Sequence, residues 1–302
     1  MEEQRGLSLV GVVVTIIVIA FILALIIPAF HCGCRMSYGV ICATNLKGLG
    51  TAMFVYANDY DGLYPQLGKG PWAKELGYSY EDTAFKPYDY EGSCTITSSL
   101  YLLVREADVS PKSFICPRQS EQTEFEGQNS RNLDIVELWD FGPDPYKHVS
   151  YAYHNPYGKY PANGNRSAAF AVMSGMSPWM KDGDFVGPNE DKNLPPQIIN
   201  ITDESTYEKS NSLNHAQYDE EYLIFFKRTK RRPCGVGQPV QYADGHVSFE
   251  QQPNVGVKND NIYTYWSTEE NPTEQDTQGG TAPTSRDPEN DAKSEDDSFL
   301  AI

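Results

Sequence analysis

The side chains that could perform acid–base or nucleophilic chemistry are few and scattered. The chain has five histidines, His31, His148, His154, His215 and His246. None lies in a nucleophile motif such as Gly-x-Ser-x-Gly, and no set of residues selects a triad assembled in space. His215 and His246 fit better as turn and strand residues that make local hydrogen bonds. We therefore predict that the protein is not an enzyme.

The cysteines are the other candidates for redox or metal chemistry. The chain has six, Cys32, Cys34, Cys42, Cys94, Cys116 and Cys234. They are too few and too scattered for a disulfide scaffold, and their connectivity does not follow from the sequence. If the domain lies outside the cytoplasm, one or two bridges are expected, and Cys94 with Cys116 is the first pair to test. The run HCGC at 31–34 has no visible partner pair for structural zinc, so we expect packing or cross-linking there.

Two acidic turns could collect oxygen ligands for calcium. They are NDYDG at 58–62, which contains Asp59 and Asp61, and KDGDF at 181–185. A full site needs about six to eight oxygens, and neither stretch matches the calcium loop that ends in Glu. Asp and Gly are also ordinary residues of a helix stop. We predict no cofactor, with calcium at Asp59 and Asp61 as the open alternative.

Charge limits the partners of this protein. The formal net charge of -17 at pH 7 argues against nucleic acid or an anionic surface as the partner of the chain as a whole. The basic cluster KRTKRR at 227–232 is a local exception, and it could bind an anionic envelope polymer, a phospholipid headgroup or the acidic end of its own chain. We favour a solvated hairpin tip whose charges prevent the pairing of strand edges.

Residues 7–30 form an uncharged, apolar stretch near the amino terminus. At about 1.5 Å rise per residue it can cross a hydrocarbon core of roughly 30 Å with some tilt. A secretory signal would be shorter and would precede a small-residue cleavage site, which HCGCRMSYGV does not offer. We therefore predict a retained, single-pass transmembrane helix over 7–30.

An apolar stripe continues the helical pattern beyond this stretch. Its members alternate at spacings of four and three residues: Cys42, Leu46, Leu49, Met53, Tyr56 and Tyr60. Gly62, with Pro65 just beyond it, is typical of a helix end at Asp61-Gly62. The sequence predicts one helix over 7–61, with its first half in lipid and its second half packed on a soluble domain.

The middle of the chain predicts an antiparallel sheet. Six short apolar runs lie between turn residues, at 148–153, 168–173, 221–226, 239–243, 246–250 and 262–266. In PVQYADGHVSFE a two-residue Asp244-Gly245 turn would pair Tyr242 with Val247. A helix followed by strands indicates an α+β domain, which we place at 62–266.

The end of the chain, 267–302, is acidic and almost without apolar residues before its last four. Such a composition does not bury enough apolar surface to offset the entropy lost on ordering. We predict a disordered acidic tail.

These pieces occur in the order typical of one family. The run RGLSLVGVVVTIIVIAFILALIIPA followed by CATNLKGLGTAMFVYANDYDGLYP resembles a type IV prepilin or a type II secretion pseudopilin. Further matches are FICP at 114–117, SYAYHNPYG at 150–158, NSLNH at 211–215 and YADGHVSF at 242–249. They are similar to the prepilin-type group with a His, spacer and Asp-Gly motif, here His215, Asp244, Gly245 and His246.

The resemblance implies processing, fold and location. In that family a prepilin peptidase cuts after a glycine, here Gly6, and methylates the new first residue, here Leu7, so residues 1–6 would be a leader. It also implies a pilin-like fold in which the long helix packs on the sheet. The chain would be anchored in the bacterial cytoplasmic membrane, with its amino terminus inside and its domain outside. Prepilin peptidase and other pilin-like subunits, met through the amino-terminal helix, are the implied partners.

Two departures from the family bear on function. The family usually has Glu five residues after the cut and this chain has Gly11, while the spacer from His215 to Asp244 is longer than usual. That Glu is thought to pair with a neighbour's terminal amine, because an unpaired charge within a bilayer is costly. Because this acid is absent, we expect a minor or tip subunit. Such a subunit can be incorporated into a filament, but it does not add repeatedly along the filament. The alternative is a membrane-anchored binding module for glycan or protein that uses the pilin signal only for delivery.

Overall fold

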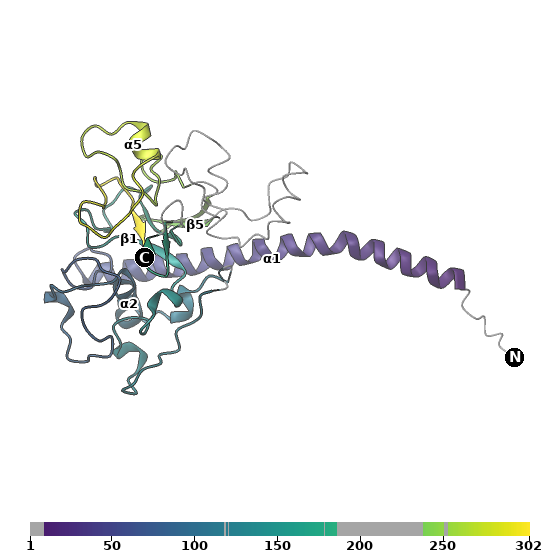
Figure 1. Cartoon of the computed structure of the whole chain (residues 1–302), viewed down its shortest axis with the longest axis horizontal. Helices are drawn as coiled ribbons and strands as arrows, with labels where there is room; N and C mark the ends of the chain where they lie inside the picture. Colours follow the sequence, from purple (N-terminus) through teal and green to yellow (C-terminus); the bar gives the residue numbers. More distant parts are fainter. Residues whose placement is uncertain (1–8, 118, 120, 178, 186–237, 251–252) are drawn as a thin grey trace.

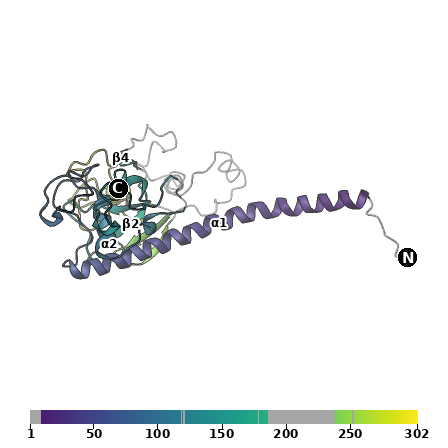
Figure 2. The same ribbon diagram turned by 90° about the horizontal axis from the view of Figure 1, so that it is seen from below.

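In the computed structural model the longest element is α1, which runs without interruption from Leu9 to Asp59 (Figure 1). Its 51 residues span about 76 Å at 1.5 Å per residue. Figures 1 and 2 show the first half of α1 projecting away from the sheet. The predicted helix is thus confirmed within the residues that the structure describes. They are 9–117, 119, 121–177, 179–185, 238–250 and 253–302, without the side chains of 24–37, 88, 181 and 275.

The helix ends where the sequence predicts. Asp61 and Gly62 have positive φ angles of 54° and 81°, and the Gly62 amide donates to the carbonyl oxygen of Ala57 at 2.8 Å. This backbone reversal closes the last turn of a helix with a left-handed residue. Asp61 itself holds the first left-handed position, one residue before the expected glycine.

Among the described residues, five antiparallel strands form the main sheet, in the order β6-β5-β2-β1-β7. They are β1 (Tyr151–His154), β2 (Ala171–Gly175), β5 (Gln238–Tyr242), β6 (Val247–Glu250) and β7 (Leu300–Ala301). A separate ribbon pairs β3 (Met180–Lys181) with β4 (Asp184–Phe185). Together with α1, the antiparallel sheet confirms the predicted α+β class.

Four predicted strands overlap strands of this sheet. The runs at 148–153, 168–173, 239–243 and 246–250 correspond to β1, β2, β5 and β6. The prediction at 262–266 is wrong, because that stretch makes only an isolated bridge between Tyr265 and Thr281. The run at 221–226 lies outside the described residues.

The hairpin between β5 and β6 has a wider turn than predicted. Gln241 pairs with Val247, and the amide of Tyr242 donates to the carbonyl oxygen of His246 at 3.0 Å. Three residues therefore form the loop, and the predicted pairing of Tyr242 with Val247 is wrong. A three-residue loop requires a left-handed residue at its end, and Gly245 supplies it with φ of 80°.

One face of the sheet packs on helices. Tyr151, Tyr153 and Met173 share a core with α1 and with α2 (Ile96–Glu106). The predicted apolar stripe of α1 is confirmed, because its buried members are Cys42, Leu46, Leu49, Met53 and Tyr56, with Tyr60 partly buried. This face is therefore built as the sequence predicts.

The opposite face is covered by loops and by the carboxyl-terminal segment. Side chains at alternate positions of the strands form a second core there: Ala152, Ala171, Val240, Tyr242 and Leu300. Trp179, Ile262 and Tyr263 pack on them. Apart from its edge strand β6, the sheet is consequently buried on both sides.

The prediction of a disordered tail at 267–302, and of a domain that ends at 266, is wrong. This segment contains α5 (Glu274–Gln278) and β7, which pairs with β1 through Tyr153–Ala301 and His154–Leu300. Ile302 is also fully buried. Composition is misleading here because the segment builds no core alone. Its few apolar residues complete a core that the sheet supplies.

Short helices complete the domain. Four are 3-10 helices: η1 (Pro87–Asp89), η2 (Pro111–Phe114), η3 (Ile135–Glu137) and η4 (Pro145–Lys147). At the start of α2 the hydroxyl of Thr95 accepts the Ser98 amide at 3.0 Å, as expected of an N-cap. Thr95 and Thr97 also donate to the buried carboxylate of Asp140 at 2.8 and 2.9 Å.

Candidate functional site: the two halves of the long helix

From Leu9 to Leu23, α1 presents an apolar surface. Every residue from Leu9 to Leu23 is exposed, up to 81% for Leu9, and none is charged. A Cβ placed on Gly11 would meet nothing within 4 Å among the described residues. The hydroxyl of Thr15 donates to the Gly11 carbonyl oxygen at 2.8 Å, so this polar group is satisfied within the helix. The surface is thus continuous and apolar around Gly11.

Among the described residues, one helical stretch is long and apolar enough to cross a membrane, Tyr38–Asp59, with a mean hydropathy of 1.2 over its most apolar 18 residues. However, 44% of those 18 residues are buried inside the protein. Leu9–Leu23 is a second apolar part of the same helix, and it is exposed throughout. The predicted span 7–30 extends beyond the described side chains at both of its ends.

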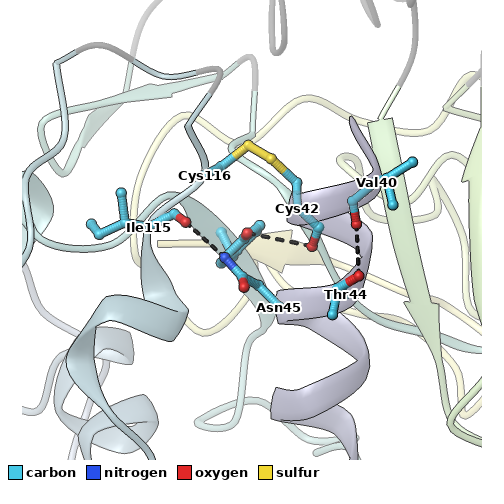
Figure 3. The surroundings of a disulfide bond; sticks show 7 residues. Val40, Cys42, Thr44, Asn45, Ile115 and Cys116 are labelled. Atoms are coloured by element: carbon cyan, nitrogen blue, oxygen red, sulfur yellow. Dashed lines mark hydrogen bonds between the residues drawn. A yellow bond between two sulfur atoms is a disulfide. The ribbon is translucent and has the colours of Figure 1, made fainter. Parts of the chain in front are cut away.

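A disulfide ties the second half of α1 to the domain. It joins Cys42 to Cys116, with the two Cα atoms 5.1 Å apart (Figure 3). The predicted pair Cys94–Cys116 is wrong, since Cys94 is free and buried, and its thiol donates to the Gly92 carbonyl oxygen at 3.3 Å. Burial raises the pKa of the Cys94 thiol to about 11. Cys94 is therefore held as a neutral thiol inside the core.

Two hydrogen bonds flank this disulfide. The amide nitrogen Nδ2 of Asn45 donates to the Ile115 carbonyl oxygen at 2.8 Å, in the residue before Cys116 (Figure 3). The buried hydroxyl of Tyr151 on β1 donates to the Cys42 carbonyl oxygen at 3.4 Å. The disulfide and the two hydrogen bonds thus fix α1 to the domain at Cys42 and Asn45, near the start of the part of the helix that packs on the domain.

The tip of the β5–β6 hairpin docks on α1 further along. Lys47 Nζ donates to the Gly245 carbonyl oxygen at 2.6 Å. A Cβ on Gly245 would lie 2.4 Å from the ring of Phe54, so only glycine fits at this left-handed position. Gly50 of the helix similarly lies against the side chain of Gln241 on β5. The Asp-Gly turn of the predicted motif is therefore a packing contact with the helix.

His246 and Asp244 form a local pair at the same tip. Asp244 Oδ1 accepts from the His246 amide at 2.9 Å and lies 2.5 Å from His246 Nδ1. The imidazole stacks on Tyr242 with ring centroids 4.4 Å apart. The hydrogen bond from the His246 amide lowers the pKa of Asp244. Both side chains are about half exposed, and their contacts stabilise the turn, as expected for His246.

The other described histidines also make local contacts. His154 is fully buried, with Nε2 2.9 Å from the Tyr160 carbonyl oxygen, while its Nδ1 accepts the Phe299 amide at 3.1 Å. Burial lowers the pKa of His154 to about 4. His148 Nδ1 lies 2.8 Å from the Thr123 carbonyl oxygen. Within the described part of the chain, no hydrogen bond joins a histidine ring to a serine or cysteine side chain.

The acidic turns do not gather into a cluster. Asp59 and Asp61 lie at the exposed end of α1, and Asp59 Oδ1 accepts from Asn58 at 3.2 Å. In the second turn Asp184 pairs with Lys74 at 2.6 Å. Among described residues, no three or more His, Cys, Asp or Glu side chains are placed to hold a metal ion.

Several predicted sites fall outside the described residues. These are Gly6, Leu7 and His215, together with the basic cluster at 227–232. The spatial relation of His215 to Asp244 is therefore not described. The side chains of the HCGC run at 31–34 are likewise outside the description.

No family model, curated protein or solved structure matches this chain. Its own geometry therefore carries the functional argument. Sequence reasoning missed the Cys42–Cys116 bridge, although Cys42 lies on the stripe predicted to face the domain. The place of Cys42 on that stripe was the signal that could have revealed the bridge. A helix residue that faces the core is a better candidate to pair with Cys116 than Cys94, for which the sequence predicted no position.

Proposed function

We propose that this protein is a prepilin-like, single-pass membrane protein, and a minor or tip pseudopilin-like subunit of a type II secretion or type IV pilus-like assembly. One observation carries this proposal. From Leu9 to Leu23 a single unbroken helix exposes an uncharged and almost entirely apolar surface, and its second half packs on an antiparallel sheet. Its role would be structural, with the helix joining neighbouring helices and the domain presenting a partner surface.

Physical chemistry supports a membrane for the first half of α1. Burying a Val, Leu, Ile or Phe side chain contributes about 1.5–3 kcal/mol, and this half exposes many of them to solvent. The stretch Tyr38–Asp59 already buries 44% of itself in the protein, so it is the poorer candidate for contact with lipid. The predicted span 7–30 uses the exposed surface and leaves the packed half to the domain.

The disulfide supports a domain outside the cytoplasm. Stable structural disulfides form in oxidising compartments such as the bacterial periplasm. Cys42 and Cys116 are both fully buried, as expected for a structural bridge. With the domain outside, the amino terminus would face the cytoplasm, where prepilin peptidase would act after Gly6.

Gly11 favours a minor or tip position in the assembly. The surface around it is apolar and has no acid that could pair with a neighbour's terminal amine. A tip or initiating subunit requires fewer such pairings than a subunit added along a filament. The protein would then start or cap an assembly.

Mass spectrometry of the amino-terminal peptide, on protein from its native membrane, tests the processing step. We expect a mature chain that begins at N-methylated Leu7. A chain that retains residues 1–6 would contradict the prepilin assignment. Gly6→Leu is the matched variant and should leave the leader uncut without altering the fold.

A second function has an observation in its favour. A shallow polar hollow on the surface is lined by Asn163, Asn165, Arg166, Ser167, Glu295 and Asp296. Such groups suit a polar ligand, so the chain could be an anchored binding module for envelope glycan or protein. Gly11→Glu separates the two functions. It should change the amount of protein in a filament fraction if the chain assembles, and an unchanged distribution would favour the binding module.

A further inference from the structure

Two buried acids hold the last residues of the chain on the sheet. We call residues 291–302 the carboxyl-terminal strap. Asp297 lies within it and Asp260 lies in the loop beneath it, and both are fully buried. Asp260 Oδ2 accepts the Ser298 amide at 2.8 Å, so one acid holds the strap from outside it.

Both acids also accept hydrogen bonds from Trp266. Asp260 Oδ1 accepts the indole N–H at 2.8 Å, and Asp297 Oδ2 accepts the backbone amide of Trp266 at 2.9 Å. Asp297 Oδ2 accepts the Lys293 amide at 2.7 Å as well. Asp297 Oδ1 has no hydrogen-bond partner in the described part of the chain. Two carboxylates therefore lie close to one tryptophan, and one oxygen is unsatisfied.

The charged groups around this pair do not neutralise it. Lys293 Nζ donates to the Glu289 carbonyl oxygen at 2.5 Å, and Lys258 Nζ pairs with Asp296 at 3.1 Å. Asp291 and Asp296 are further acids nearby. Burial, and then the repulsion between the two acids, raises the pKa of Asp260, while burial raises the pKa of Asp297 to about 8. Near neutral pH the pair therefore retains a proton.

The far end of the strap depends on a different group. The Phe299 amide donates to His154 Nδ1, which accepts only while it is unprotonated. Beyond it, the Leu300 amide donates to the Ile262 carbonyl oxygen at 2.8 Å, and Ala301 pairs with Tyr153 on β1. Detaching the strap would thus expose the edge of β1 and part of both cores, since Phe299 and Ile302 belong to the first and Leu300 to the second.

We propose that the strap is a proton-controlled cover: it stays on the sheet while the Asp260–Asp297 pair carries a proton, and it opens when both acids ionise. The open form exposes the backbone N–H and C=O groups of the β1 edge. Such an edge is a template for pairing with another extended segment. Opening would therefore convert a closed sheet into one that accepts an added strand.

The direction of the pH dependence follows from the two kinds of group. For Asp297, whose pKa is raised from 3.8 to about 8, the stabilising contribution is lost as pH rises through that range. For His154, whose pKa is lowered from 6.5 to about 4, the contribution is lost as pH falls through its range. Above about pH 6.5 the contribution of His154 is complete, and buried acids act: the Asp260–Asp297 pair and, within the strap, Asp291, whose pKa burial also raises. There the opening constant should rise by up to about tenfold per pH unit for one proton.

Hydrogen exchange followed by mass spectrometry tests this on the full, oxidised chain in detergent micelles. After correction for intrinsic exchange, amides of 291–302 should lose protection between about pH 6.5 and 8, by up to about tenfold per unit. Amides of residues 38–59 should not change. The variant Asp297→Asn, which is neutral at any pH, should weaken the dependence, because burial still raises the pKa of Asp260. Replacing both acids by asparagine should remove the part of the dependence that is due to the pair. Asp287→Asn removes an exposed acid that lies just before the strap and should retain the wild-type profile.

Two results would overturn the proposal. The first is strap protection that is independent of pH in the wild-type chain, which needs no variant and therefore no assumption about folding. The second is protection that millimolar calcium makes independent of pH and that a chelator removes at constant pH. In that case a cation, and not a proton, would neutralise the pair. If Asp297→Asn does not fold, Asp260→Asn serves as the second variant, with the same expected weakening of the pH dependence.

Discussion

The two faces of the sheet are buried by different means. One face packs on α1 and α2 through aliphatic and aromatic side chains, and a disulfide fixes the helix there. The other face is covered largely by irregular chain, whose amides are held by the buried carboxylates Asp260 and Asp297. Burial of apolar area is insensitive to pH, whereas burial of acids is not. We therefore expect the helix face to be permanent and the strap face to open first.

The largest effect is expected when two fully buried leucines, one on each face, are replaced and compared. Leu49 lies on the helix face, and Leu300 lies in the strap. Leu49→Ala should lower the free energy of global unfolding by about 2–5 kcal/mol, because it removes methyl groups and leaves a cavity. Leu300→Ala should lower mainly the free energy of local strap opening, with a smaller global effect. Urea titration of the full chain measures the first quantity and hydrogen exchange measures the second.

The control for these variants is Leu63→Ala, because the Leu63 side chain is 46% exposed. It should change global stability by no more than about 0.5 kcal/mol. Equal global losses for the two buried leucines would show that both faces unfold as one unit. That outcome would remove the distinction between them.

The next largest effect concerns the covalent link of the helix face. Replacing Cys42 and Cys116 together by alanine should cost about 2–4 kcal/mol of global stability, because the unfolded chain regains the freedom of a 74-residue separation. Cys94→Ala should leave the sensitivity of the protein to reductant unchanged. Peptide mapping without reduction gives the pairing directly. A bridge that contains Cys94 would contradict the structure.

A smaller effect on global stability is expected from a buried acid on the helix side of the sheet. Asp140 is buried beneath α2, and burial raises its pKa from 3.8 to about 7. Its contribution to stability is therefore lost as pH rises from about 4 to about 7, by up to about 1.4 kcal/mol per unit. Asp140→Asn should flatten global stability over this range. Strap exchange above pH 7 should be unaffected, and a change there would mean that the two sides are coupled.

The same comparison explains what could be predicted from the sequence. The stripe from Cys42 to Tyr56 is a local signal, because helical periodicity places its members on one face whatever covers them. The helix stop at Asp61-Gly62 and the overlap with four strands rest on similarly local patterns. The α+β class and the helix–sheet packing followed from these signals.

The missed features depend on distant parts of the chain. The strap has no periodicity, since its amides are satisfied by acids and its apolar residues complete a core made elsewhere. The bridge from Cys42 to Cys116 depends on where η2 lies against α1, which no local pattern encodes. The turn at Gly245 was predicted one residue too short, because packing on Phe54 and Lys47 favours the wider loop.

The position of the disulfide also has a mechanical consequence. A pull along α1 from its exposed end reaches the disulfide at Cys42, and the bridge passes the force to Cys116. The residues between these cysteines form a closed loop that does not lengthen under tension. At about 3.3–3.6 Å per extended residue, roughly 250 Å of contour length is withheld from extension. In the oxidised protein, the segment that contains α2 and much of the helix core would keep its length under load while the strap, which lies outside the loop, could peel away.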